Sequence, residues 1–181
     1  MNQAVFLDRD GVLNRAVVRQ GKPYPPNGLD ELEVLSGVPD ALAELKRMGF
    51  LLIVVTNQPD VARGKQSRSI VEEIHRVLFS SLPLDDVEVC YHDDVDACEC
   101  RKPRPGMILS AAAKHNVNLR TSYLVGDRWR DVEAGQAAGC RTIFIDCGYD
   151  EWSLMASDFR ASSLFDAVNW IKKQEKQEKH L

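Results

Sequence analysis

The segment Val5-Phe6-Leu7-Asp8-Arg9-Asp10-Gly11 is an apolar run that ends in two carboxylates and a glycine. In an extended strand the side chains of residues i and i+2 point to the same side, so Asp8 and Asp10 can converge at the end of one strand. Two close carboxylates repel each other unless a cation or a shared proton lies between them. Mg²⁺ prefers oxygen ligands, and a carboxylate beside it can attack phosphorus to form an aspartyl-phosphate. A polar strand end that enters a turn explains this short motif equally well, so the rest of the sequence has to separate the two interpretations.

Length and composition predict one globular domain over residues 1–181. Of the 181 residues, 44% are hydrophobic and 28% are charged, which is the profile of an ordinary domain with one core. The formal net charge of -4 gives no broad attraction to nucleic acid or to anionic membranes. No apolar run approaches the ~20 residues of a membrane span, and the first residues lack the features of a signal peptide. We therefore expect a cytoplasmic protein that binds a small molecule, and, without a heptad pattern, a monomer.

Strand-like and helix-like segments alternate along the chain. Short apolar runs predict strands at about 4–8, 51–55, 87–89, 122–125 and 142–145. Apolar residues at helical spacing predict helices at about 38–48, 67–79, 105–115, 130–138 and 164–172. His75 is interpreted as a surface residue of the second helix, and the polar tail at about 173–181 is expected to fray. The alternation predicts an α/β fold in which helices cover both faces of a mostly parallel central sheet.

Polar residues follow the predicted strands where each strand ends. Ligands bind at the carboxyl ends of the strands in such sheets, and independent surface charges need not fall there so consistently. Three strands end in such residues, and a fourth is followed by two cations after a loop: Asp8 with Asp10, Thr56 with Asn57, Gly126 with Asp127, and Arg101 with Lys102.

Taken as one site, these residues suit phosphoryl transfer. Asp8 and Asp127 can supply carboxylate oxygens to Mg²⁺, with the backbone carbonyl of Asp10 as a third ligand. Asp8 would attack in line, while Asp10 would protonate the leaving oxygen and later remove a proton from the attacking water. Thr56 and Asn57 offer donors for phosphate oxygens, and Lys102 offers a balancing positive charge.

Asp131 has two interpretations of equal weight. It lies four residues after Asp127, one helical turn on, so it can face the same site and hold the metal through water. Alternatively, it is a favourable negative charge in the first turn of a helix.

The motifs as a set resemble those of the haloacid-dehalogenase-like phosphohydrolases. The match runs in order along nearly the whole chain, through residues 8–11, 55–57, Lys102 with Pro103, and 126–127 with Asp131. The resemblance implies a Rossmann-like three-layer sandwich, a Mg²⁺ cofactor and a nucleophilic Asp8. The spacings between the motifs leave no room for a large cap domain, so loops must close the site and select the substrate.

A second cluster lies at about 90–100, where Cys90-x-His92 and Cys98-x-Cys100 offer three thiolates and one imidazole. This is a suitable tetrahedral set for Zn²⁺, and a closed set of four ligands predicts a structural metal. Two idle pairs of thiols are the alternative, but Cys98 and Cys100 are awkwardly spaced for a disulfide. The zinc would stabilise the loop and set where Arg101 and Lys102 point. Cys140 and Cys147 are interpreted as packing residues or mildly exposed thiols.

The zinc loop followed by Arg-Lys-Pro-x-Pro-Gly narrows the resemblance to the D-glycero-D-manno-heptose-1,7-bisphosphate 7-phosphatases. Asn14 and the segments 56–58 and 62–64 fit the same group. The resemblance implies that Asn14, Arg101 and Arg128 contact the substrate, and that the reaction removes the 7-phosphate. The sequence departs from the usual pattern at residues 59–60, 91 and 128–130.

Two other functions remain open on the sequence. Histidinol-phosphate phosphatases have a very similar zinc loop. A zinc-stabilised binding domain without catalysis is the alternative from another class, although a binder has no need of an acid two residues after a nucleophile. Trp129 and Trp152 are expected in core or rim packing, with lining of the site entrance as the less favoured alternative.

Overall fold

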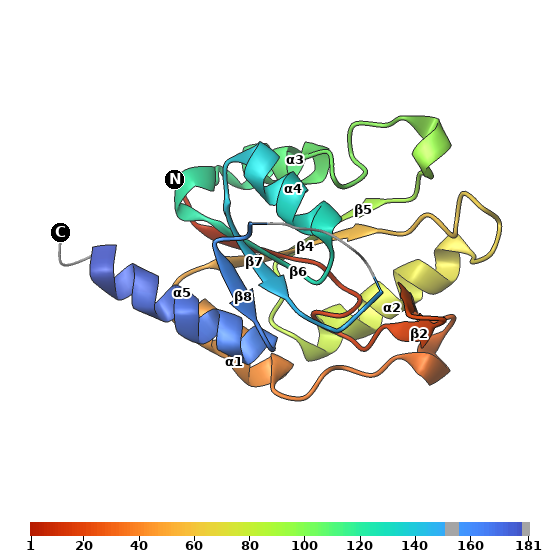
Figure 1. Cartoon of the computed structure of the whole chain (residues 1–181), viewed down its shortest axis with the longest axis horizontal. Coiled ribbons are helices and arrows are strands. Elements are labelled where there is room, and N and C mark those ends of the chain that lie inside the picture. Colours follow the sequence, from red (N-terminus) through yellow and green to blue (C-terminus); the bar gives the residue numbers. More distant parts are fainter. Residues whose placement is uncertain (151–155, 179–181) are drawn as a thin grey trace.

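The computed structural model describes residues 1–150 and 156–178. A six-stranded sheet forms its centre in the order β5-β4-β1-β6-β7-β8, and every neighbouring pair of strands is parallel. Its strands are β1 (Ala4–Leu7), β4 (Leu51–Asn57), β5 (Asp86–Cys90), β6 (Tyr123–Gly126), β7 (Arg141–Ile145) and β8 (Phe159–Ala161). The predicted parallel α/β sheet is confirmed (Figure 1).

The side chains of β1 alternate between two apolar cores, which explains the three layers. In β1, Val5 and Leu7 belong to one apolar cluster, whereas Ala4 and Phe6 belong to a second cluster on the other face. Successive side chains of a strand point to opposite faces, so a strand buried on both faces is apolar throughout. The Rossmann-like sandwich therefore has two cores, one on each side of the sheet.

Five helices cover the two faces: α1 (Val38–Arg47), α2 (Arg68–Ser81), α3 (Gly106–His115), α4 (Trp129–Ala138) and α5 (Leu164–Glu178). Residues of α1, α2 and α5 pack in the first core, and residues of α3 and α4 pack in the second. Figure 1 shows α3 and α4 on one side of the sheet and α1 and α5 on the other. Among the described residues, no helix is long and apolar enough to cross a membrane.

A small hairpin stands beside the carboxyl ends of the strands. The long connection after β1 contains β2 (Val17–Arg19), which pairs antiparallel with β3 (Lys22–Tyr24). Three single-turn helices, η1 (Leu29–Glu31), η2 (Asp94–Asp96) and η3 (Leu119–Thr121), complete the elements. No cap domain is present in the described residues that follow β1 and β4, as the spacing of the motifs predicted.

The structure corrects two predictions and adds three strands. His75 is buried against Arg9 rather than exposed on the surface of α2. The helix α5 continues to Glu178, so residues 173–178 are helical rather than frayed. The hairpin and β8 were not predicted, because strands of three half-exposed residues carry too little apolar pattern. The expectation for Trp152 falls outside the described residues.

Candidate active site

Three buried carboxylates and one lysine meet at the carboxyl ends of β1, β4 and β6. Carboxylate oxygens of Asp8, Asp127 and Asp131 all lie within 4.8 Å of one another. The Nζ atom of Lys102 donates to Asp8 Oδ1 at 2.7 Å, to Asp131 Oδ1 at 2.5 Å and to the carbonyl of Val55 at 2.7 Å. One cation thus faces three acids, and the cluster carries an excess of negative charge whenever all three are ionised.

This crowding shows in the pKa values. Burial, which outweighs Lys102 and is reinforced by Asp131, raises the pKa of Asp8 from 3.8 to about 6. Burial also raises the pKa of Asp127 well above its ordinary value, reinforced by Asp8 and Asp131. Burial acts to lower the pKa of Lys102, but Asp131 and Asp8 outweigh it, so that pKa lies above the usual lysine value. The lysine is therefore charged, and the acids lack a balancing cation.

Two glycines allow the acids to approach so closely. Gly11 has a φ of +93°, and a Cβ there would lie 1.9 Å from Asp127 Oδ2. A Cβ on Gly126 would lie 2.1 Å from the Cβ of Asp131. A side chain at either position would displace the neighbouring carboxylate. Gly11 and Gly126 are therefore needed for the close packing of the acids.

Asp127 fits a divalent cation. Both of its carboxylate oxygens are buried and lack a hydrogen bond of good geometry, although the nearby Tyr149 hydroxyl acts to lower the pKa of Asp127. Buried polar atoms are nearly always paired, and hard cations prefer carboxylate oxygens. An unpaired carboxylate within 4.8 Å of two others is therefore suited to hold a metal such as Mg²⁺.

Asp131 lies at the start of helix α4 and also faces the carboxylate cluster. It caps helix α4, because its Oδ2 accepts from the backbone N–H of Arg128 at 3.0 Å. Its other oxygen faces Lys102 and belongs to the carboxylate cluster. A carboxylate in the first helical turn is thus also within reach of the site.

Asp10 stands apart from the cluster, at the edge of the cavity. Its Oδ1 accepts from Arg9 Nε at 3.1 Å and Asn14 Nδ2 at 2.9 Å. Its Oδ2 accepts from Arg9 Nη2 and Gln58 Nε2, both at 2.9 Å. Asp8 and Asp10 line the same cavity, as predicted, although Asp10 is not one of the three acids whose oxygens all lie within 4.8 Å of one another.

The structure does not bring Asn14 to the substrate cavity. Its side chain is fully buried and donates to Asp10 and to the carbonyl of Arg15. The amide donates to Asp10 and is not among the residues that line the cavity. The resemblance that implied substrate contact gave no means to see this, because the partner of Asn14 is set by the turn after β1.

Thr56 and Asn57 hold the floor of the cavity. The Thr56 hydroxyl accepts from Gln58 Nε2 at 2.9 Å, which leaves its own hydrogen available for a ligand. The Asn57 side chain binds Lys102 twice through the backbone: Nδ2 donates to the lysine carbonyl and Oδ1 accepts from the lysine N–H, each at 3.1 Å. Asn57 thereby fixes where Lys102 enters the site.

A cavity of about 250 Å³ opens above these residues, with Asp8, Asp10 and Lys102 in its wall. Cations also line it, from four separate segments of the chain: Lys22, Arg63, Arg101, Arg128 and Arg130. The sequence did not single out Lys22 or Arg130 as site residues. Lys22 lies on the unpredicted hairpin, and Arg130 had no visible partner in its own helix.

Two neighbouring acids link three of these arginines. Asp94 Oδ1 accepts from Arg101 Nε at 2.8 Å and from Arg130 Nη1 at 2.9 Å. The carboxylate of Asp93 accepts from Nε and Nη2 of Arg63, at 2.7 and 2.5 Å. The two arginines hold the pKa of Asp94 well below its usual range. The acids thus keep the cations at the rim of the cavity while no anionic ligand is bound.

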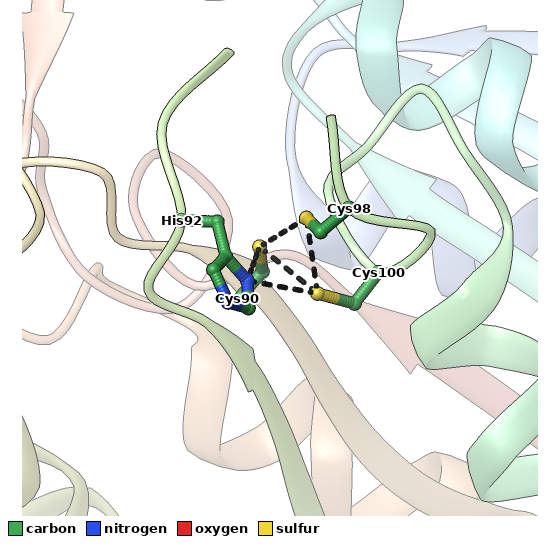
Figure 2. Close-up of side chains that lie close together, drawn as sticks. All are labelled: Cys90, His92, Cys98 and Cys100. Carbon is green, nitrogen blue, oxygen red and sulfur yellow. Dashed lines mark hydrogen bonds between the residues drawn. The ribbon is translucent and has the colours of Figure 1, made fainter. Parts of the chain in front are cut away.

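The four residues of the second cluster converge, as Figure 2 shows. The Sγ atoms of Cys90, Cys98 and Cys100 lie 3.3 to 3.7 Å apart. His92 Nδ1 lies 3.6 Å from the first sulfur and 3.3 Å from the last. Thiolates about 2.3 Å from a tetrahedral zinc would be separated by about 3.8 Å. The cluster therefore could hold a metal ion with little rearrangement.

The cluster also positions the arginine that follows it. Arg101 Nη1 donates to the carbonyl of His92 at 3.3 Å while its Nε holds Asp94. Arg104 donates to the carbonyls of Ala97 and Cys98 and closes the loop from the other side. Of the remaining cysteines, Cys140 is buried and Cys147 is exposed, as expected for thiols outside the cluster.

Comparison with known proteins agrees with this geometry. Residues 99–169 match the model of the HAD-hydrolase-like family. D-glycero-β-D-manno-heptose-1,7-bisphosphate 7-phosphatase of Escherichia coli K12 is 38% identical, over 96% of this chain and 95% of that protein. The enzyme of the same name from Yersinia pestis is 37% identical, over 93% and 95%.

A solved structure has the same fold. The D,D-heptose 1,7-bisphosphate phosphatase of B. bronchiseptica, complexed with magnesium and phosphate, superposes with a TM-score of 0.82. The two sequences are 28% identical, and the superposition covers 95% of this chain and 99% of the solved one.

Fold and site together define a phosphatase of the haloacid-dehalogenase-like class, with no cap domain within the described residues. The alternative of a binding domain without catalysis is thereby excluded. More narrowly, the chain belongs to the family of the D-glycero-D-manno-heptose-1,7-bisphosphate 7-phosphatases, and the predicted resemblance is confirmed.

Proposed function

We propose that the enzyme removes the 7-phosphate of D-glycero-β-D-manno-heptose 1,7-bisphosphate in a Mg²⁺-dependent reaction. The observation that carries this proposal is the identity of 38% over 96% of the chain with a phosphatase of that name. Histidinol phosphate, the alternative substrate, carries one phosphate and an amine. The cavity offers cations beyond those needed for one phosphate, which favours a substrate with two phosphates.

The second phosphate is proposed to bind between Arg101 and Arg130. Both guanidinium groups already hold an anion there, since both donate to the same oxygen of Asp94. That carboxylate is more than half exposed, so a phosphate with three acceptor oxygens can replace it. Arg128 lines the same wall and would add a third contact.

The first half of the reaction transfers the phosphoryl group to Asp8. Lys102 holds Asp8 Oδ1, which leaves Oδ2 to attack phosphorus. The bond from Oδ2 to phosphorus forms while the ester bond to the sugar oxygen breaks, and Asp10 gives its proton to that oxygen. The Thr56 hydroxyl and Lys102 stabilise the charge on the transferring group.

The second half releases phosphate. Asp10, now ionised and held by donors on both of its oxygens, removes a proton from water. The water oxygen bonds to phosphorus, and the bond to Asp8 breaks, which returns both acids to their starting forms.

Two metals complete the proposal. Asp8, Asp127 and the carbonyl of Asp10 would hold Mg²⁺, with Asp131 behind them. The ion would neutralise the repulsion between Asp8 and the phosphoryl oxygens. A structural Zn²⁺ would be held by Cys90, His92, Cys98 and Cys100, whose separations suit a tetrahedral site.

We further propose a single domain over residues 1–181 that acts as a monomer in the cytoplasm on a small molecule. Three thiols reserved for metal binding suit a reducing compartment. A net charge of -4 does not favour nucleic acid or anionic membranes as partners. Light scattering coupled to size-exclusion chromatography would test the oligomeric state, for which a mass near 20.3 kDa is expected.

Phosphate release tests the proposed activity. Both anomers of D-glycero-D-manno-heptose 1,7-bisphosphate would be compared with histidinol phosphate and fructose 1,6-bisphosphate, in the presence of Mg²⁺. We expect a clear preference for the β-anomer and no activity in the Asp8→Asn variant. A preference for histidinol phosphate would reassign the substrate, and an active Asp8→Asn variant would refute the nucleophile.

A further inference from the structure

A buried arginine separates the two catalytic aspartates. The Arg9 side chain is fully buried, and its Nε and Nη2 atoms grip the two oxygens of Asp10 in a fork at 3.1 and 2.9 Å. The third corner of the guanidinium points the other way. There Nη1 lies 3.1 Å from Nε2 of His75, a residue of α2 with 7% of its surface exposed.

The direction of this hydrogen bond follows from the chemistry of arginine. A guanidinium group has only donors, so His75 Nε2 has to be the unprotonated acceptor. Burial, reinforced by the charge of Arg9, lowers the pKa of His75 to about 4. The imidazole is therefore neutral at physiological pH, with its proton on Nδ1.

The contact fixes the plane of the guanidinium. The fork sets Arg9 and Asp10 in one plane, and Asn14 and Gln58 each donate to one oxygen of Asp10. The bond from Nη1 to His75 is the contact that holds the far side of the guanidinium itself. The imidazole itself is held, because Ile74 and Leu78 on either side of it in α2 pack in the first core. The orientation of Asp10 is thus connected to a helix 65 residues away in the sequence, counting from Asp10 to His75.

We propose that His75 is a positioning residue, whose neutral imidazole holds the Arg9 fork in the plane that aims Asp10 at the leaving oxygen. This inference rests on the proposed acid/base role of Asp10. His75 touches neither substrate nor metal ligand, so it acts only through Arg9.

Misorientation of the Asp10 carboxyl changes the kinetics in a way that a general structural defect does not. Proton donation matters most when the leaving oxygen is strongly basic, as in an alkyl phosphate such as benzyl phosphate. It matters little for p-nitrophenyl phosphate, whose phenolate leaves without help. The ratio kcat/KM reports the steps up to transfer to Asp8, in which Asp10 acts as the acid. A merely structural defect lowers kcat/KM for both esters by the same factor.

The test measures kcat/KM on both esters for the wild type and four variants. His75→Phe keeps a ring but loses the acceptor, with His75→Leu as the substitute if the larger ring prevents folding. His75→Gln restores an acceptor oxygen. Asp10→Asn removes the acid itself, and Glu73→Gln, on the exposed side of α2, is the control. Circular dichroism would compare their folds.

We expect the loss of kcat/KM in His75→Phe to be on the order of tenfold larger for benzyl phosphate than for p-nitrophenyl phosphate. His75→Gln is expected to recover most of that difference, and Glu73→Gln to match the wild type. Equal losses on both esters in His75→Phe, beside an unequal loss in Asp10→Asn, would overturn the role of His75 alone. An equal loss in Asp10→Asn would instead refute the acid role of Asp10, and the inference with it. Because both probes are generic esters, neither result depends on which sugar is the substrate.

Discussion

At the scale of single residues, the site is governed by a shortage of positive charge. Lys102 donates to Asp8 and Asp131, while no cation among the described residues donates to Asp127. Asp10 lies outside this shortage, because the cationic Arg9 grips both of its oxygens. The two aspartates of one short motif therefore have different environments, as expected where one is a nucleophile beside a cation and the other moves a proton.

The Asp10→Asn variant separates these two roles. An amide is nearly isosteric, and its oxygen keeps the contacts of one carboxylate oxygen, while its NH2 group cannot accept from the donors on the other side. It also cannot donate and take a proton at oxygen. We expect kcat to fall by about 10²- to 10⁴-fold while the affinity for inorganic phosphate stays within about threefold. Steady-state kinetics and phosphate titration by calorimetry check the two quantities. Turnover at the wild-type rate would remove Asp10 from proton transfer.

Arg101 tests the second phosphate. Without it, one of the two guanidinium groups around Asp94 is missing, while Lys102 still serves the hydrolysed phosphate. We expect Arg101→Ala to lose about 10- to 100-fold in kcat/KM on the heptose bisphosphate, equivalent to about 1.4 to 2.7 kcal/mol. The loss on p-nitrophenyl phosphate should stay below about threefold.

Arg76→Ala is the matched control for charge, because Arg76 is exposed on α2 away from the cavity. It should leave both substrates unaffected. If Arg101→Ala lowers kcat/KM equally on the heptose bisphosphate and on p-nitrophenyl phosphate, Arg101 does not contact the second phosphate.

At the scale of elements, the loop between β5 and α3 depends on its cysteine cluster. The segment between Cys90 and Cys100 contributes a single turn of helix and buries little apolar surface, so backbone pairing alone cannot fix it. We expect Cys98→Ala to lose the zinc and to lower Tm by roughly 5 to 10 °C, as for a loss of a few kcal/mol in a protein of this size. Elemental analysis and calorimetry measure the two effects.

Cys140→Ala is the control for this prediction. Cys140 is also buried but lies outside the cluster, so its variant should lose some stability and keep its zinc. Zinc content that is unchanged in Cys98→Ala would refute the four-ligand assignment.

Elements also explain what the sequence could predict. The five principal strands were predictable from continuous apolar runs, as in β1, and the helices from apolar residues at helical spacing, as in α1. The β2–β3 hairpin was not, since its residues are mostly half-exposed and its position depends on the surrounding loops. Within the site, residues at strand ends could be found from their position alone. The pairs Arg9–His75 and Asp94–Arg130 could not, because each joins elements whose approach only the fold determines.

At the scale of the whole molecule, metal binding, protonation and folding are linked through the carboxylate cluster. The pKa of Asp8 is raised from 3.8 to about 6, so the folded protein binds this proton more tightly than the unfolded chain does. Without a divalent cation, the stabilisation from that proton is present below about pH 4 and is lost as the pH rises through 6. A cation binds the ionised acids and reverses this loss, so its effect on stability should grow over the same interval.

We therefore expect Mg²⁺ to raise Tm more at pH 7.5 than at pH 5. At 100 times its dissociation constant a ligand stabilises by about 2.7 kcal/mol, which corresponds to roughly 5 to 10 °C for a chain of 150–250 residues. At pH 5 the ion must first displace the proton of Asp8, at a cost of about 1.4 kcal/mol for one pH unit, and the rise in Tm should be smaller by roughly half. Calorimetry in buffers without chelator, which leave the zinc in place, measures both shifts. Asp127→Asn removes a proposed ligand and should abolish the rise at both pH values, whereas the same rise in that variant, or a rise independent of pH, would place the Mg²⁺ outside this cluster.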